Sequence, residues 1–256
     1  MKIKVLALSL IAAFASSSAL AFVALPESGQ LRITAQNDVT EDPLWLGFGW
    51  SPTSEGYTRA AARVSSVLYD GIDVGNFYDY VFRSDSDNTL LFASRFELLV
   101  GEVEVGDLEY EVEINDIFRR GFAGYDVSVG WYFQTGSDFG ISSVAHSNSP
   151  RTRPANPADV FDDNVVDFRT DISVEEGNPT TAWYVIKTNA TQFDYLVNAV
   201  SIRQAPSVSG DDPPLRNAMF EGFAPIPAVP EPSEYAMFLA GLGMVGFVAR
   251  RRMNRI

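Results

Sequence analysis

The sequence predicts a mainly β protein, built as a single antiparallel β-sandwich or jelly-roll-like domain with one or two short helices. Apolar and polar residues alternate over several strand-length segments, and Gly, Asn, Asp or Pro clusters separate them. Helical periodicity is rare by comparison. The segments expected to form strands are 31–36, 78–84, 89–100, 110–114, 125–133, 181–188 and 195–204.

Two short stretches favour helix instead. Residues 58–67 read TRAAARVSSV, and in residues 115–120 Asn115 stands at an N-cap position before DIFRR. A proline-rich stretch follows the last expected strand and predicts an extended, semi-rigid spacer. The expected division is therefore a signal segment at 1–21, a β-sandwich body at 22–205, the spacer at 206–228 and a C-terminal segment at 229–253.

The first residues have the pattern of a secretory signal peptide. Lys2 and Lys4 precede an apolar run over 5–15, and Ala19 and Ala21 then form an A-x-A cleavage site. We expect cleavage after Ala21 and export by the secretion machinery. The alternative, a first transmembrane helix, is disfavoured because the apolar run is short and no stop-transfer pattern follows it.

Near the C-terminus, Gly241, Gly243 and Gly246 spell G-x-G-x-x-G. A dinucleotide loop with this spacing follows a strand, whereas Pro230 and Pro232 here oppose a central strand. No cofactor is therefore predicted from these glycines.

A membrane anchor fits the same region better. Residues 235–249 carry no charge and are followed by Arg250, Arg251 and Arg252. Fifteen helical residues span about 22 Å, less than a hydrocarbon core of ~30 Å, but snorkelling arginines and local thinning reduce the mismatch. The pattern predicts a C-terminal transmembrane helix with its arginines in the cytoplasm. A buried core helix is the alternative.

The order of Pro230, Glu231 and Pro232, an apolar helix and the cluster Arg250–Arg252 resembles the PEP-CTERM sorting signal of Gram-negative bacteria. The resemblance covers about a tenth of the chain, and Glu234 and Tyr235 depart from the small or hydroxyl residues expected there. It implies cleavage near Pro-Glu-Pro by an exosortase and a location at the cell surface or outside the cell. It also implies a setting rich in extracellular polysaccharide.

Composition narrows the chemistry of the body. The chain has no cysteine, which excludes disulfides and thiolate sites. Residues 22–232 contain 32 acidic and 13 basic residues, a charge of about −19 at neutral pH. Nucleic acid is therefore not an expected partner, because its binding depends on cations that neutralise phosphates.

Candidate reactive groups are few. His146, the only histidine, lies in a polar, proline-broken stretch and is expected to be an ordinary surface residue. Glu102, Glu104, Glu109, Glu111 and Glu113 alternate along a predicted strand, which indicates a solvated sheet face more than a hydrolytic pair.

Two acidic clusters are weak candidates for calcium, although Asp and Asn are also common turn residues. They contain Asp85 and Asp87, and Asp162 and Asp163. Trp45 and Trp50, in a Gly- and Pro-containing segment, are possible glycan contacts, with core packing as the alternative.

These patterns predict an exported, non-enzymatic protein of the cell surface or extracellular matrix. A carbohydrate-binding or ice-binding-like sandwich module is the first alternative, although no regular threonine spacing supports the ice-binding version. A secreted hydrolase that uses carboxylates is the second.

Overall fold

A computed structural model describes most of the body and part of the tail: residues 22–26, 32–36, 38–69, 71–105, 108–134, 138–149, 160–205, 218–228 and 237–245. The expected signal peptide with Ala19 and Ala21, the Pro-Glu-Pro motif and the arginine cluster lie outside these residues.

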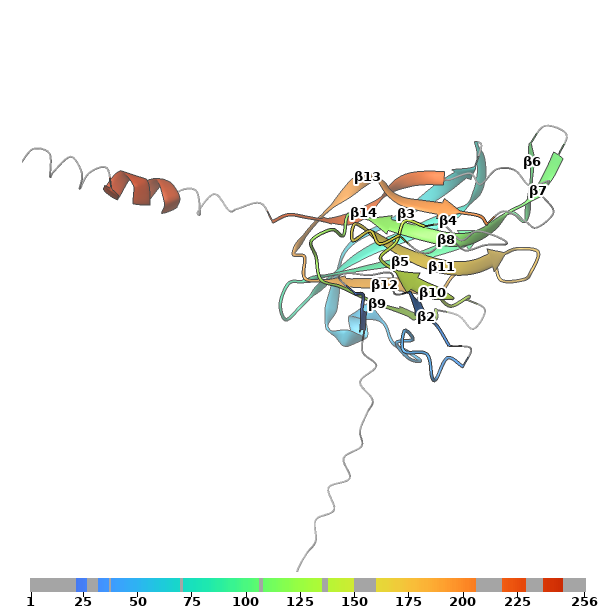
Figure 1. Cartoon of the computed structure of the whole chain (residues 1–256), viewed down its shortest axis with the longest axis horizontal. Coiled ribbons are helices and arrows are strands. Elements are labelled where there is room, and N and C mark those ends of the chain that lie inside the picture. Colours follow the sequence, from blue (N-terminus) through green and yellow to red (C-terminus); the bar gives the residue numbers. More distant parts are fainter. Residues whose placement is uncertain are drawn as a thin grey trace, which may run out of the picture.

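The described strands form two antiparallel six-stranded sheets that lie face to face (Figure 1). In spatial order, sheet A contains β1 (Val23–Ala24), β9 (Val127–Tyr132), β12 (Trp183–Thr188), β5 (Leu90–Leu98), β4 (Ile72–Ser84) and β3 (Tyr57–Tyr69). Sheet B contains β14 (Ala218–Ile226), β13 (Gln192–Arg203), β8 (Glu113–Arg120), β11 (Val165–Ser173), β10 (Ser143–Ala145) and β2 (Ile33–Thr34). The predicted mainly β class is confirmed, and the two sheets are consistent with the predicted sandwich.

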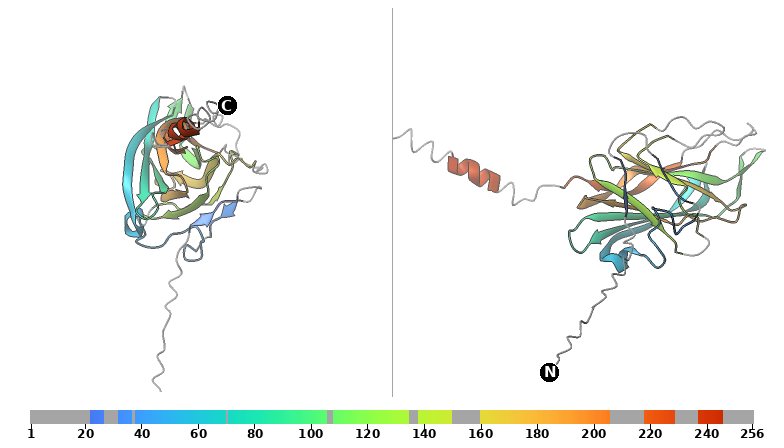
Figure 2. Two further views of the ribbon diagram at one scale, coloured as in Figure 1. Left: turned by 90° about the vertical axis from the view of Figure 1, so that its left-hand side faces the viewer. Right: turned by 60° about the horizontal axis from the view of Figure 1, so that its bottom comes forward.

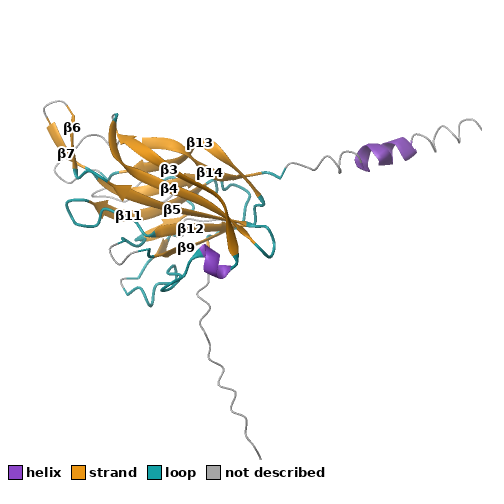
Figure 3. Ribbon diagram, turned by 180° about the vertical axis from the view of Figure 1, so that it is seen from behind, coloured by secondary structure: helices purple, strands orange, loops and turns teal. Residues whose placement is uncertain are grey.

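Two smaller elements complete the body. The hairpin of β6 (Glu102–Val105) and β7 (Leu108–Glu111) projects from the end of the sandwich opposite to the C-terminal helix (Figure 1). A short 3-10 helix, η1 (Pro52–Glu55), precedes β3 and lies beside sheet A (Figure 3).

The core fills the space between the sheets. Strand alternation points Phe77 of β4 and Phe92 of β5 inward from sheet A, where they join Ile117 and Phe168 of sheet B in one apolar cluster. All four side chains are almost fully buried. Their removal from water, at roughly 25 cal/mol per Å² of apolar surface, is the main force that holds the layers together.

The helix predicted over 58–67 is wrong, because these residues belong to β3. Strand β3 pairs with β4 from Tyr57↔Ser84 to Tyr69↔Ile72, and Gly71, at φ 86°, lies in the turn between them. The alanines in this stretch have high helix propensity, but thirteen residues of hairpin pairing override it.

The helix predicted over 115–120 is also wrong. These residues lie in β8, which pairs with β11 on one side and β13 on the other. The Asn115 side chain is not an N-cap: its Nδ2 donates to Asp171 Oδ1 at 2.9 Å, and its Oδ1 accepts from the Ala205 amide. Burial on both faces removes the polar alternation that would mark a strand in the sequence.

Strand β14 lies within the segment interpreted as spacer. It pairs with β13 from Gln192↔Ile226 to Ile202↔Ala218, so the body extends beyond residue 205 and the strand predicted at 195–204 has a successor. Pro225 is tolerated in β14 because this strand is at the edge of sheet B.

A helix over residues 237–245 lies apart from the sandwich (Figures 1 and 2). Met237, Phe238 and Leu239 are 65–75% exposed, which contradicts the alternative of a buried core helix. No helix in the described part of the chain has the length and apolarity needed to cross a membrane. The transmembrane helix over 235–249 stays a prediction.

One ion pair crosses the core. Asp79 of β4 and Arg119 of β8 both point inward, with Arg119 Nη1 and Asp79 Oδ1 3.0 Å apart and both side chains buried. Strand β14 joins them: the Phe223 amide donates to Asp79 Oδ2, and Arg119 Nη2 donates to the Phe223 carbonyl, each at 2.7 Å. Burial raises the pKa of Asp79, and the nearby guanidinium opposes that shift.

We expect Asp79→Ala to destabilise the body by about 3–5 kcal/mol, because it leaves the Arg119 charge buried without its partner. Urea unfolding of the single variant, followed by tryptophan fluorescence, measures this loss. The double variant Asp79→Leu/Arg119→Met should lose less, because it removes both charges. A single variant as stable as the wild type would show that the pair does not hold the sheets together.

Candidate functional site

The outer face of sheet A carries a floor of aromatic rings. Alternation along β4 turns Tyr78, Tyr80 and Phe82 away from the core, and Trp183 of β12 and Tyr132 of β9 face the same way. The rings belong to an apolar cluster separate from the main core.

These rings contact one another across the strands. Trp183 and Tyr132 are direct partners in the β12–β9 register, and their rings are nearly parallel, with centroids 6.3 Å apart. The Tyr80 ring lies 4.8 Å from Trp183 on the other side. Tyr78 and Tyr80 are half-buried, whereas Trp183 is 6% exposed, so the tyrosines offer the accessible ring surface.

A loop over residues 43–56 forms one wall. Leu46 donates its amide to the Trp131 carbonyl at 2.9 Å, which attaches the loop to β9. Gly130 makes this approach possible: a Cβ there would lie 2.8 Å from Leu46 Cδ2. The loop then enters η1, which has a Ser51 capping box and Pro52 in its first turn.

Polar side chains form the rest of the rim. Arg59 of β3 is exposed, and its guanidinium carbon lies 5.6 Å from the centre of the Tyr80 ring. Gln134, just after β9, accepts from Trp183 Nε1 at 2.7 Å. Together with Ser51, Pro52, Thr53 and the aromatic floor, these residues enclose an open groove of about 690 Å³, which we call the aromatic groove.

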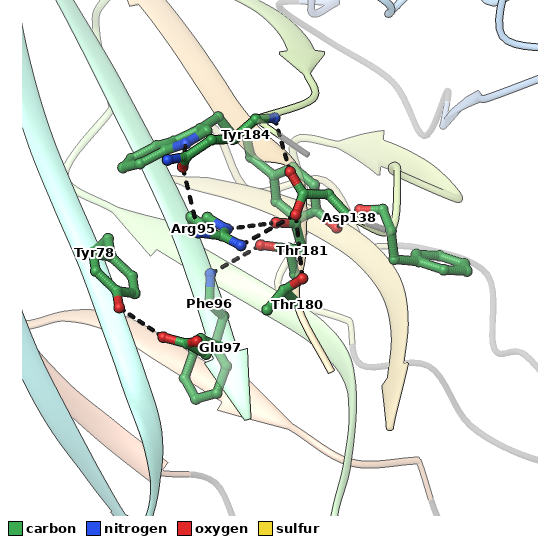
Figure 4. Close-up of polar contacts among 11 residues, drawn as sticks. Tyr78, Arg95, Phe96, Glu97, Asp138, Thr180, Thr181 and Tyr184 are labelled. Atoms are coloured by element: carbon green, nitrogen blue, oxygen red, sulfur yellow. Dashed lines mark hydrogen bonds and ion pairs between the residues drawn. The ribbon is translucent and has the colours of Figure 1, made fainter. Parts of the chain in front are cut away.

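Arg95 of β5 is the second cation in the groove, and the protein holds it firmly (Figure 4). Its guanidinium lies 3.1 Å from the buried Asp138 carboxylate and donates to the Thr181 carbonyl at 3.2 Å. Asp138 also accepts from Thr180 Oγ1 at 3.2 Å. Most of the charge on Arg95 is therefore balanced within the protein.

Tyr78 is fixed in a similar way. Its hydroxyl donates to Glu97 Oε2 at 2.6 Å (Figure 4), and this bond, followed by burial, raises the pKa of Tyr78. The phenol therefore stays neutral at physiological pH. The floor of the groove presents neutral ring faces held in fixed orientations.

Trp45 and Trp50, the possible glycan contacts in the sequence, both lie outside the aromatic groove. Trp45 is 7% exposed and packs in the main core cluster, so the prediction of an accessible ring there is wrong. Its loop folds back onto β9 through the Trp45↔Trp131 bridge. Trp50 is half-buried between Phe22 and Tyr132 and lines a neighbouring depression rather than the aromatic groove.

Sequence reasoning missed Tyr78, Tyr80, Arg59 and Arg95. The signal was present in FYDYVF over residues 77–82, where aromatic rings occupy the alternate positions 78, 80 and 82. The other alternate positions, which begin with Phe77, face the core, so these three rings are left facing outward.

His146 is buried, so its interpretation as a surface residue is wrong. It is 8% exposed, its Nδ1 lies 3.1 Å from the Val165 carbonyl, and its ring meets Phe161 edge to face. The residues after β10 lie beside those that precede β11, joined by the Ser147↔Phe161 bridge and by the bond from the Asp162 amide to the His146 carbonyl. Burial lowers the pKa of His146, while the Val165 carbonyl opposes the shift.

The calcium candidates act as turn residues. Asp85 accepts from Thr58 Oγ1 at 2.8 Å, and Asp87 accepts from the Thr89 amide and hydroxyl. Asp162 accepts from the Asn164 amide at 3.1 Å, and Asp163 is exposed in the same turn. Within the described residues, no three acidic or histidine side chains are grouped to hold a metal ion.

The alternating glutamates lie mostly on the β6–β7 hairpin and not in the groove. Glu102 is opposite Glu111, and Glu104 is opposite Glu109. Glu111 Oε1 accepts from Ser173 Oγ at 3.0 Å.

The C-terminal residues match a known sorting motif. A family model described as the PEP-CTERM protein-sorting motif matches residues 228–252. The chain carries a PEP-CTERM sorting signal. This signal begins two residues after β14 ends, and it marks an exported exosortase substrate destined for the cell surface or the extracellular space. No curated protein and no solved structure matches the chain significantly.

The buried environment of His146 gives a prediction for the imidazole itself. We expect an NMR titration of this single histidine to give a pKa below its ordinary value of 6.5. Because the unfolded chain then binds a proton that the folded chain excludes, this group makes stability fall as the pH drops below about 6.5.

His146→Gln should remove that part of the pH dependence, as measured by urea unfolding at pH 5.5 and 7.5. A titration midpoint at or above 6.5 would contradict the buried, neutral imidazole.

Proposed function

We propose that this protein is a non-enzymatic component of the cell surface or extracellular matrix, and that its body binds polysaccharide in the aromatic groove. The observation that carries the proposal is the set of outward-facing rings on sheet A, framed by polar side chains, in a chain that carries a sorting signal for export.

Sugar rings fit this arrangement chemically. One face of many pyranoses presents C–H groups, which pack on aromatic faces, while hydroxyl groups at the ring edge bond to polar side chains. Tyr78 and Tyr80 supply the faces, and Arg59 and Gln134 supply rim hydrogen bonds. A volume of about 690 Å³ is within the usual range for ligand sites, and an open groove suits an internal stretch of a chain.

Binding without turnover is supported by the composition of the groove. Glycoside hydrolysis ordinarily uses two carboxyl groups that flank the scissile bond. The described residues that line the groove include neither aspartate nor glutamate. An ice-binding-like surface is less well supported, because rings and arginines occupy this face.

The tail fits transient membrane attachment. In this proposal, residues 235–249 hold the exported chain in the membrane, with Arg250, Arg251 and Arg252 on the cytoplasmic side, until an exosortase cuts near Pro230.

Deleting residues 229–256 tests the role of the tail. The shortened chain should be exported and recovered from the medium with an unprocessed C-terminus, as determined by mass spectrometry. The full chain should instead give a product that ends near Pro-Glu-Pro. Identical products from the two chains would contradict processing through the tail.

Tyr80→Ala tests the groove. We expect affinity for the host's own polysaccharide to fall by about tenfold or more, because stacking on an aromatic ring is lost. Phe48→Ala is the matched control, since Phe48 is 81% exposed and lies outside the groove lining. Affinity electrophoresis in polysaccharide-containing gels measures both, and an equal effect of the two variants would argue against the groove.

A further inference from the structure

The charge of the aromatic groove is opposite to that of the body. Residues 22–232 carry about −19, yet the charged side chains among the described groove residues are two arginines, Arg59 and Arg95. A groove whose charged side chains are arginines, on an acidic protein, favours an anionic ligand. Opposite charges attract across an interface, whereas like charges are repelled.

The two arginines differ in what they offer a ligand. Arg95 is bound to Asp138 and to the Thr181 carbonyl, so much of its charge and hydrogen-bonding capacity is already used. Among the described residues, the Arg59 guanidinium has only its contact with the Tyr80 ring. Arg59 is therefore the cation available to a ligand, directly beside the accessible ring.

The depression beyond the 43–56 loop gives an internal comparison. Its charged residues are Glu55, Asp87, Asp126 and the single cation Lys187. That depression also contains an aromatic ring, Trp50, but its charge is unsuited to an anion. On the outer face of sheet A, aromatic surface and positive charge therefore coincide at the aromatic groove.

We propose that the groove recognises an acidic polysaccharide, with the carboxylate of a uronic acid bound to Arg59 and the pyranose ring of that residue packed on Tyr80. This inference rests on the proposed polysaccharide binding and specifies its ligand class. A guanidinium matches a carboxylate with two parallel hydrogen bonds, a geometry that a neutral hydroxymethyl group does not reproduce. The negative body repels polyanions that are not aligned with the groove, which makes binding selective.

The test compares two forms of the same sugar chain. Oligogalacturonate and oligomannuronate are titrated by calorimetry into the whole chain in mild detergent, and each is also used after chemical reduction of its carboxyl groups. The acidic forms should bind at least about tenfold more tightly than the reduced forms, in line with a charge-assisted hydrogen-bonded contact.

Variants locate the effect. Arg59→Gln should abolish the preference for the acidic forms, because it weakens their binding far more than that of the reduced forms. Arg63→Gln is the matched control: it lies four residues further along β3, is half exposed, and contacts Glu221 and Tyr195 instead of the groove. It should preserve the preference.

The outcomes separate this inference from the proposed function. If neutral oligosaccharides bind as tightly as acidic ones, and only Tyr80→Ala weakens them, the groove binds sugar and the acidic specificity is wrong. If dextran sulfate binds through Arg59 and the uronates do not, the carboxylate assignment is overturned. If no oligosaccharide or native polysaccharide binds, both proposals fail.

Discussion

The buried pair of Asp79 and Arg119 is the contact on which the relation between the two sheets depends. An aspartate and an arginine without partners would be very costly at the centre of a sandwich, so each side chain requires the other and the Phe223 backbone in place. Apolar packing between sheets is tolerant of small shifts, whereas these polar contacts are directional. They therefore fix which strands face each other, and they attach β14 to both layers.

The same strand that supplies Asp79 also supplies the floor of the groove. Along β4, the inward set of Phe77, Asp79 and Val81 joins the sheets, and the outward set of Tyr78, Tyr80 and Phe82 faces the aromatic groove. Because side chains alternate rigidly along a strand, a slip of one residue in the β4 register would exchange the two sets. The register of β4 that buries Asp79 is therefore the same register that places Tyr78 and Tyr80 on the outer face.

Much of the fold could be predicted from alternation and punctuation. Strands such as 78–84 and 181–188 can be recognised in the sequence because one face is apolar and the ends carry turn residues. Strand β8 could not be recognised, since burial on both faces removes its pattern, and β3 was obscured by alanines whose local preference yields to hairpin pairing. Strand β14 could not be recognised because it lies in a proline-rich segment. Pro225 is acceptable there only because β14 is at the edge of the sheet.

The site was harder to foresee than the fold. Tryptophans are the obvious candidates for sugar contacts in the sequence, yet Trp45 is in the core and Trp183 is almost fully buried. The accessible rings of the groove are tyrosines. Which of the two alternating sets of β4 side chains faces outward depends on the partner sheet, and Arg59 reaches Tyr80 only because β3 pairs with β4. The tail, by contrast, is a linear signal and could be identified without any knowledge of folding.

The end of β14 limits how far the Pro-Glu-Pro motif can lie from the folded sandwich. Ile226 is the last residue of the strand, and Pro230 is four positions later. Even a fully extended backbone covers at most about 14 Å over four residues. The exosortase cleavage site near Pro230 therefore lies within about 14 Å of the last strand, so the folded body itself limits the directions from which a processing enzyme can approach it.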